Sequence, residues 1–232
     1  MLKNVNLTSI ALLLGMVALL DSCVPEDSVD VNQDRIYADY ELFYNSNTDK
    51  TWVVARFKFG NALGTALELK EDAFVTFNGD TLPYNAFYAG HFKEYAGYIH
   101  SGSFFYRDHN ANVFENTIPA VDTIAIPPTL DTIAKSSAYT LSWVGSPLAA
   151  DEAVGVFIGS NWIWGQDALL YQDGDGATNI VIGTNVLNNV AVGPATCYMD
   201  RSKEVNLTEG TSAGGRIRQK FRAKNKSLYV KN

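Results

Sequence analysis

Two tryptophans in the second half of the chain have the spacing of a sugar-binding platform. Trp162 and Trp164 flank Ile163, so on a strand both indoles project from the same side. Exposed indoles can stack on sugar rings, whereas buried indoles only add to a hydrophobic core. With 12% aromatic residues the chain has a core to fill, and burial is the commoner place for tryptophan. Both interpretations stay open, and Trp162 and Trp164 are the candidate ligand-binding residues.

Two polar segments place oxygen atoms at alternate positions, as calcium-binding loops do. They run from Asp108 to Asn112 and from Gln172 to Gly176. Neither completes the EF-hand pattern, and turns between strands use Asp, Asn and Gly for backbone reasons alone. We therefore predict no bound metal and keep Asp173 and Asp175 as the calcium candidates.

The three histidines could form a metal site only if the fold brings them together. His91, His100 and His109 follow one another at intervals of nine residues. An odd interval reverses the face of a strand at each step, and no carboxylate or thiol repeats with them. We expect three separate histidines rather than a metal centre.

Catalytic motifs are missing from the sequence. It contains no Gly-x-Ser-x-Gly, no His-Glu-x-x-His, no phosphate-binding loop and no dinucleotide fingerprint. Paired carboxylates such as Asp151 and Glu152 occur, but glycosidases need a cleft separation that no sequence displays. We predict a protein that is not an enzyme, with no catalytic residue and no cofactor.

The charge pattern argues against nucleic acid as a partner. The net charge is −7, which repels phosphate backbones. Positive charge gathers at the carboxyl end, where residues 200–232 hold nine basic and three acidic side chains. Five cations alternate along one segment and predict a strand with one basic face: Arg216, Arg218, Lys220, Arg222 and Lys224. This face could hold anionic sugars or lipid, or be a solvated strand face.

The amino terminus has the order of an export signal. Lys3 precedes an apolar run from Ile10 to Leu20, which is too short to span a bilayer. The following residues resemble the lipobox of bacterial lipoproteins: Leu20, Ser22 and Cys23 match it, and Asp21 departs from it. The resemblance implies cleavage before Cys23 and attachment of acyl chains to it, with membrane lipid as a partner. The alternative is an ordinary signal peptide before a secreted protein.

Residues 23–35 form an acidic segment after the lipidated cysteine. Glu26, Asp27, Asp30 and Asp34 lie in it, with too few apolar residues to predict order, so we expect a flexible tether. The segment is similar to the surface-export signal of Bacteroidota lipoproteins, which implies the outer membrane or cell surface. A solvated linker is the other interpretation.

The remaining chain has the two-residue period of β-strands. Ile36 to Tyr44 and Trp52 to Phe59 predict a hairpin, and Asn78-Gly79-Asp80 predicts a tight turn. Further strands are expected at Phe104–Tyr106, Val113–Asn116, Tyr139–Trp143, Ala153–Ile158, Ile180–Ile182 and Arg216–Phe221. No long helix is expected after residue 23, and Cys197, with no partner if Cys23 carries lipid, is expected to be buried.

Residues 119–137 divide the strands into two sets. The segment holds Pro127 and Pro128 and repeats Asp-Thr-Ile-Ala, so we place a domain boundary there. The predicted fold is all-β, with two antiparallel immunoglobulin-like β-sandwiches over residues 36–126 and 127–232. The chain resembles surface lipoproteins of Bacteroidota with tandem immunoglobulin-like domains.

The sequence therefore predicts a location more sharply than a reaction. We expect a lipid-anchored protein of the envelope or cell surface, a non-catalytic module that binds glycan or protein. The alternative is a structural subunit that assembles with other envelope proteins through sheet edges. An accessory hydrolase would require a pocket with at least two close carboxylates, or a histidine oriented by an acid.

Overall fold

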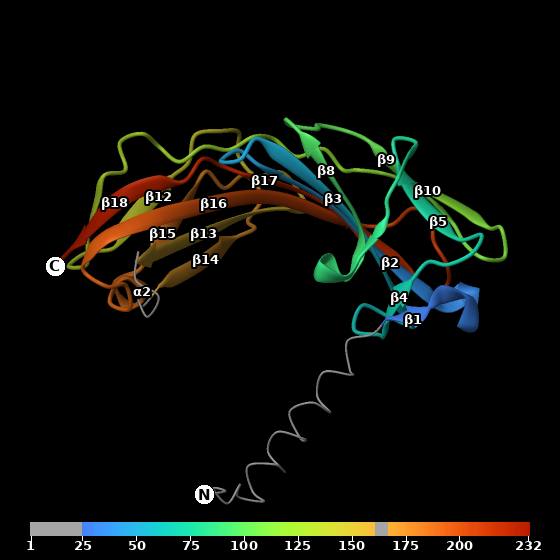
Figure 1. The fold of residues 1–232 in the computed structure, drawn as a ribbon. Coiled ribbons are helices and arrows are strands. Elements are labelled where there is room, and N and C mark those ends of the chain that lie inside the picture. Colours follow the sequence, from blue (N-terminus) through green and yellow to red (C-terminus); the bar gives the residue numbers. More distant parts are fainter. Residues whose placement is uncertain (1–24, 161–166) are drawn as a thin grey trace, which may run out of the picture.

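The computed structural model describes residues 25–160 and 167–232, almost all of whose regular structure is β-strand (Figure 1). Trp162, Trp164 and Cys23 lie outside the described residues, so the structure does not test their predicted roles. Among the residues that are described, no helix is long and apolar enough to cross a membrane.

One large sheet of twelve strands extends through both halves of the molecule. Eight strands follow in the order β1-β4-β3-β2-β17-β16-β13-β14, and β7, β8, β11 and β18 pair with them off this path. The bounds are β1 (Glu26–Asp27), β2 (Ile36–Asn45), β3 (Lys50–Phe59), β4 (Ala66–Glu68), β7 (Tyr84–Asn85), β8 (Gly90–Ala96), β11 (Thr132–Ala134), β13 (Glu152–Ser160), β14 (Ala168–Gln172), β16 (Gly193–Asn206), β17 (Gly215–Arg222) and β18 (Lys226–Lys231).

Two smaller sheets cover one face of the main sheet, at opposite ends of the molecule (Figure 1). The first contains β5 (Phe74–Phe77), β6 (Asp80–Thr81), β9 (Ser103–Arg107) and β10 (Val113–Thr117), and the second contains β12 (Tyr139–Ser142) and β15 (Asn179–Ile182). The described helices are short: η2 (Ser28–Asp30), η3 (Gln33–Arg35), η4 (Ala86–Tyr88) and α2 (Thr184–Leu187).

The predicted hairpin and tight turn are both present. β2 and β3 pair antiparallel from Ile36↔Phe59 to Asn45↔Lys50. At the tight turn Asn78 has φ 50° and Gly79 has φ 86°, the paired positive values that a two-residue hairpin loop requires. Local sequence therefore determines the antiparallel neighbours that a short turn can connect.

Two hydrophobic cores lie on the same side of the main sheet. The first holds residues from Ile36 to Ile118 together with Ile217, and the second holds residues from Val121 to Val230. Along the chain, membership of the cores changes between Ile118 and Val121, but Ile217 near the carboxyl end belongs to the first core again. On β17, Ile217 belongs to one core and Phe221 to the other.

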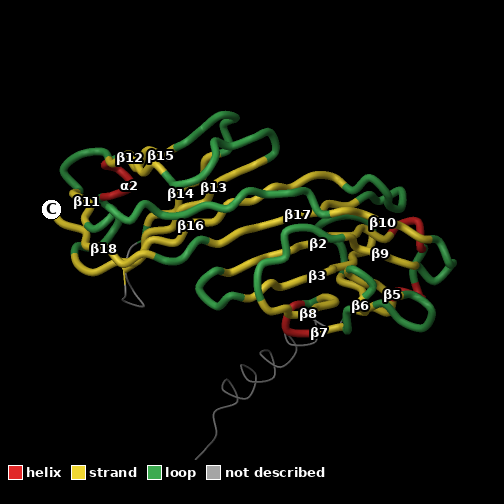
Figure 2. Tube along the Cα trace, turned by 90° about the horizontal axis from the view of Figure 1, so that it is seen from above, coloured by secondary structure: helices red, strands yellow, loops and turns green. Residues whose placement is uncertain are grey.

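The all-β prediction is confirmed, whereas two separate antiparallel sandwiches are not what the structure shows. Strands β16 and β17 run through both halves, as seen from above in Figure 2, so the main sheet is continuous. The sheet is also mixed, because β17 pairs parallel with β2, β1 with β4 and β11 with β18. Parallel partners far apart in sequence have no connecting turn, so residue patterns do not reveal them.

The expected flexible tether is folded over most of its length. β1 pairs with β4, and Ser28 is buried. The Gln33 side chain donates to the Ser28 carbonyl at 2.6 Å and accepts from the His109 amide at 3.3 Å. Specific hydrogen bonds and an added edge strand supply the order that the low apolar content did not predict.

Candidate binding site on the open sheet face

The face of the main sheet opposite the two cores carries the candidate site. On β17 the odd-numbered Ile217, Gln219 and Phe221 are buried, so the even-numbered cations lie on the other face. This face, which we call the open face, also receives the side chains of Tyr198 and Asp200 on β16. The predicted basic strand face is thereby confirmed for residues 216–222, while Lys224 lies past the end of β17.

Carboxylates of the neighbouring strands pair with the cations of β17. Arg216 contacts Asp39 at 3.0 Å and Arg218 contacts Glu41 at 3.2 Å, both across the β2 pairing. On the other side, Glu204 of β16 contacts the same two arginines. The basic strip is therefore largely neutralised inside the sheet, and only part of it can attract an anion.

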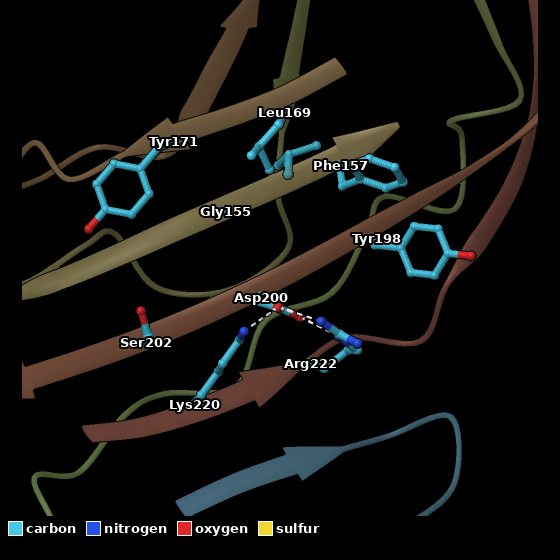
Figure 3. Close-up of a pocket in the computed structure, with 10 residues that line it drawn as sticks. Gly155, Phe157, Leu169, Tyr171, Tyr198, Asp200, Ser202, Lys220 and Arg222 are labelled. Atoms are coloured by element: carbon cyan, nitrogen blue, oxygen red, sulfur yellow. Dashed lines mark hydrogen bonds and ion pairs between the residues drawn. The ribbon is translucent and has the colours of Figure 1, made fainter. Parts of the chain in front are cut away.

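A hollow of about 290 Å³ opens on this face where β14, β13, β16 and β17 lie side by side (Figure 3). Its lining combines apolar, aromatic and charged side chains: Gly155, Val156, Phe157, Leu169, Tyr171, Tyr198, Asp200, Ser202, Lys220 and Arg222. Leu169 and Tyr171 are 78% and 68% exposed, which is high for side chains of this size on a strand.

The hollow exists because Gly155 has no side chain. Register places Gly155 between Tyr171 on β14 and Asp200 on β16. A Cβ atom built on Gly155 would meet nothing within 4 Å, so the space above it is open. The backbone of Gly155 forms the floor of the hollow, and the rings of Tyr171 and Tyr198 lie at its sides. Phe157 and Tyr198 lie with ring centroids 5.6 Å apart.

Charges at the other side of the hollow are fixed in place. Asp200 accepts from Arg222 Nε at 2.7 Å and Nη2 at 2.8 Å, and contacts Lys220 Nζ at 2.8 Å (Figure 3). Burial raises the pKa of Asp200, but the hydrogen bonds from Arg222 and Lys220 outweigh it and lower the pKa overall. The pKa of Arg222 is raised by its hydrogen bond with Asp200. The hollow thus keeps two cations and one carboxylate.

The arrangement has the chemistry of a binding surface. Aromatic rings offer stacking contacts, and fixed ammonium and guanidinium groups offer directional donors. Among the described lining residues Asp200 is the one carboxylate, and both of its oxygens are engaged by the two cations.

The three histidines lie apart in the structure. His91 is buried, His100 lies near Tyr98 and His109 near Glu71. Within the described ranges, no three His, Cys, Asp or Glu side chains are grouped in a way that could hold a metal.

Asp173 and Asp175 lie in the loop between β14 and β15. This loop is closed by backbone hydrogen bonds, from the Gly176 amide to the Leu148 carbonyl and from the Ala177 amide to the Gly174 carbonyl. The hypothesis that Asp173 and Asp175 bind calcium is supported only by their spacing in the sequence.

Cys197 is fully buried, as expected, and burial raises the pKa of its thiol to about 12. A thiol with this pKa is protonated at neutral pH and is a poor nucleophile.

The aromatic wall of the hollow was missed by sequence reasoning. The segment Ala168–Tyr171 is too short to assign from its pattern, yet it forms most of β14. The signal that could have found the site is alternation on β13, where Gly155 and Phe157 interrupt Val154, Val156 and Ile158. A glycine on the outer face, between neighbouring strands that carry aromatic side chains on that face, indicates a hollow.

Taken together, fold and site define an all-β protein with two covering layers on one long mixed sheet and an open, aromatic and charged outer face. No family model matches this chain, and neither does any curated protein.

Solved structures with some likeness include two binding proteins. One is from a study of host cell surface retention of a bacterial ice-binding adhesin, at 9% identity and a TM-score of 0.25. The match covers 85% of this chain and 65% of that one, so the chain spans somewhat less than two thirds of that structure. The other is the pair of tandem V-type regions of VCBP3, a chitin-binding protein, at 8% identity and a TM-score of 0.22. This match covers 80% of the present chain and 98% of the other. Likeness at this level does not indicate a shared function.

Proposed function

We propose that this protein is a lipid-anchored module of the cell envelope or surface that binds a glycan in the hollow above Gly155. The observation that carries the proposal is the lining of that hollow, where exposed Tyr171 and Leu169 face Lys220 and Arg222 across a glycine floor. Sugar rings have apolar faces that stack on aromatic side chains and hydroxyl edges that hydrogen-bond to charged groups.

The state of Asp200 supports binding rather than hydrolysis. Glycoside hydrolysis uses two carboxyl groups, one of them held protonated or poised as a base. The described residues that line the hollow include one carboxylate, Asp200. Hydrogen bonds from Arg222 and Lys220 lower its pKa, so it stays ionised and paired. We therefore propose a non-catalytic role.

Filling the hollow tests the proposal. Gly155→Val adds a branched side chain at a strand position where the space is open, so the fold should tolerate it. Full-length protein is screened on an array of surface polysaccharides. We expect the wild type to bind at least one glycan, and Gly155→Val to lower that signal by about tenfold or more.

The matched control for Gly155→Val is Thr140→Val. Thr140 is an exposed position on β12, in a covering layer away from the hollow. Equal glycan binding by wild type and Gly155→Val, with equal melting temperatures, would show that the hollow is not the site. A third outcome is that the wild type binds no glycan on the array but captures one envelope protein, and that Gly155→Val abolishes this capture. The ligand of the hollow would then be a protein and not a glycan.

The anchor is proposed from the residues before the described body, and Cys23→Ser tests it. We expect the wild type to fractionate with membranes and the variant to appear in the soluble fraction, because a serine cannot carry the thioether-linked acyl chains. A variant that still fractionates with lipid would remove the anchor from the proposal.

A second candidate function is assembly through the edge strand β14. Among the described strands, β14 pairs with β13 and with no strand on its other side. Its Leu169 is 78% exposed, more than any other large apolar side chain on a described strand. Light scattering of purified protein distinguishes this function. A defined oligomer that Leu169→Lys dissociates would favour it, and a monomer at all concentrations would exclude it.

A further inference from the structure

The open face continues past the hollow toward a second aromatic group. Register places side chains in rows across the strands: Tyr171, Gly155, Asp200 and Arg222 form one row. Ser202, Lys220, Phe43 and Trp52 form the next. The hollow and Trp52 are therefore two ends of one surface on the same sheet face.

Aromatic contacts hold Trp52 at the far end. Its ring lies 5.4 Å from Phe43 and 6.0 Å from Tyr88, and Tyr88 stacks on Phe92 at 4.0 Å. The indole Nε1 donates to Glu94 at 2.9 Å, which fixes the ring orientation. Trp52 remains partly exposed, so this end offers a rigid stacking surface that the pattern of Trp162 and Trp164 did not predict.

Cations occupy the middle of the surface. Lys220 Nζ and the Arg222 guanidinium lie 5.2 and 5.1 Å from the centroid of the Phe43 ring, so they bridge from Asp200 toward the Trp52 end. Arg222 uses Nε and Nη2 for Asp200, and no described residue engages its Nη1. Two cations share one carboxylate here, which leaves local positive charge on a chain whose net charge is −7.

The size of the surface excludes a single sugar as the whole ligand. Tyr171 is on β14 and Trp52 is on β3, five strand positions apart in the sheet order. At about 4.8 Å per strand, the two ends are roughly 24 Å apart. A ligand that uses both ends must be a chain lying across the strands.

We infer that the ligand is an extended acidic glycan, which crosses the open face from Tyr171 to Trp52 with its carboxylate or sulfate groups over Lys220 and Arg222. This inference rests on the proposed glycan-binding function. It adds the chemical class of the sugar, its minimum length and a second contact site.

Chain-length dependence in calorimetric titration tests the inference. The probes are a dimer and an octamer of galacturonate, matching lengths of sulfated heparin oligomers, and a neutral cello-octaose, each titrated into the full chain. We expect an acidic octamer, carboxylated or sulfated, to bind about tenfold more tightly than its dimer, and the neutral octamer to bind more weakly than the acidic one. Tighter binding of the galacturonate or of the heparin octamer shows whether the acidic group is a carboxylate or a sulfate.

Trp52→Ala should reduce octamer affinity to the dimer level while leaving dimer affinity unchanged, because the dimer reaches the hollow alone. Trp52→Phe keeps a stacking ring and should retain most of the octamer affinity. The matched control is Phe74→Ala, since Phe74 is an exposed ring on β5 in the opposite layer. Lys220→Gln should weaken acidic octamers and flatten their salt dependence.

Failure of the inference is distinguishable from failure of the proposed function. Equal affinity of dimer and octamer, or an octamer affinity that Trp52→Ala leaves unchanged, overturns the extended ligand while Gly155→Val still abolishes binding. Equal affinity for neutral and acidic octamers overturns the acidic class. If no probe binds and the polysaccharide array is also blank, the inference and the glycan function fall together.

Discussion

At the scale of single residues, one buried ion pair holds the turn that precedes β13. Arg201 and Glu152 are in contact, with side chains 1% and 5% exposed. Arg201 also donates to the carbonyls of Ser146 and Pro147, both at 2.9 Å, and Glu152 accepts from the Ala149 amide. These hydrogen bonds attach the turn to the main sheet, beside Leu148, which is buried in the second core.

Arg201→Met should lower the free energy of unfolding by about 3 to 5 kcal/mol, because it leaves the Glu152 carboxylate buried without its partner. Urea denaturation followed by circular dichroism measures the change. The double variant Arg201→Met with Glu152→Gln should recover part of the loss, since the buried charge is then gone. An unchanged midpoint for the single variant would show that the pair is not stabilising.

His91 is a buried histidine that remains neutral in the folded protein. Its Nδ1 hydrogen-bonds the Leu82 carbonyl at 2.9 Å and its Nε2 accepts from the Leu69 amide at 3.3 Å. Burial lowers the pKa of His91 below its ordinary value of 6.5, and the hydrogen bond with Leu82 only partly offsets this. A protonated ring would also lose its acceptor for the Leu69 amide.

The lowered pKa predicts a loss of stability in acid. As the pH falls, His91 is protonated in the unfolded chain before it is protonated in the folded protein. The contribution of neutral His91 to the free energy of unfolding is therefore fully present above pH 6.5 and is lost as the pH falls through the folded pKa. His91→Gln, which keeps a donor and an acceptor, should show a smaller decrease in melting temperature across this range. Parallel pH profiles for wild type and variant would assign the acid sensitivity to other groups.

At the scale of elements, β17 is positioned by charge as well as by apolar burial. Its buried residues set which face points to the cores, but a shift by two residues would preserve that face. The observed register places Arg216 opposite Asp39 and Arg218 opposite Glu41 on β2. A shift would break both pairs, so the ion pairs favour one parallel register over its neighbours.

Reversing one charge in this strand tests the role of the pairs. Arg218→Glu places a carboxylate beside Glu41 and Glu204 and should destabilise the protein by about 1 kcal/mol at low salt. High salt should reduce the difference from wild type, because screening weakens repulsion at a partly exposed site. Lys224→Glu makes the same change past the end of β17 and should have a smaller effect. Equal effects of the two variants would argue for net charge rather than pairing.

At the scale of the whole molecule, the two cores share their longest strands. β17 contributes Phe221 to one core and Ile217 to the other, and β16 contributes buried Met199 to one core and partly buried Val205 to the other. Unfolding one end would expose apolar faces of strands that the other end needs. The molecule should therefore behave as one cooperative unit despite its two cores.

Calorimetry can check this cooperativity. We expect one thermal transition with equal calorimetric and van't Hoff enthalpies, and we expect Val75→Ala in the first core and Met199→Ala in the second to lower its temperature without splitting it. Two resolved transitions, each moved by one variant only, would mean that the halves unfold separately.

The sequence by itself determined the β class, the first hairpin, the tight turn at Asn78, the burial of Cys197 and the single exposed face of residues 216–222. These follow from the two-residue period and from turn chemistry, which act between neighbours in the chain. Only the tertiary structure decided the parallel pairing of β17 with β2, the order of residues 26–35 and the hollow above Gly155. Each of these depends on residues far apart in sequence that meet across strands, and a local pattern does not record which distant strand will be the partner.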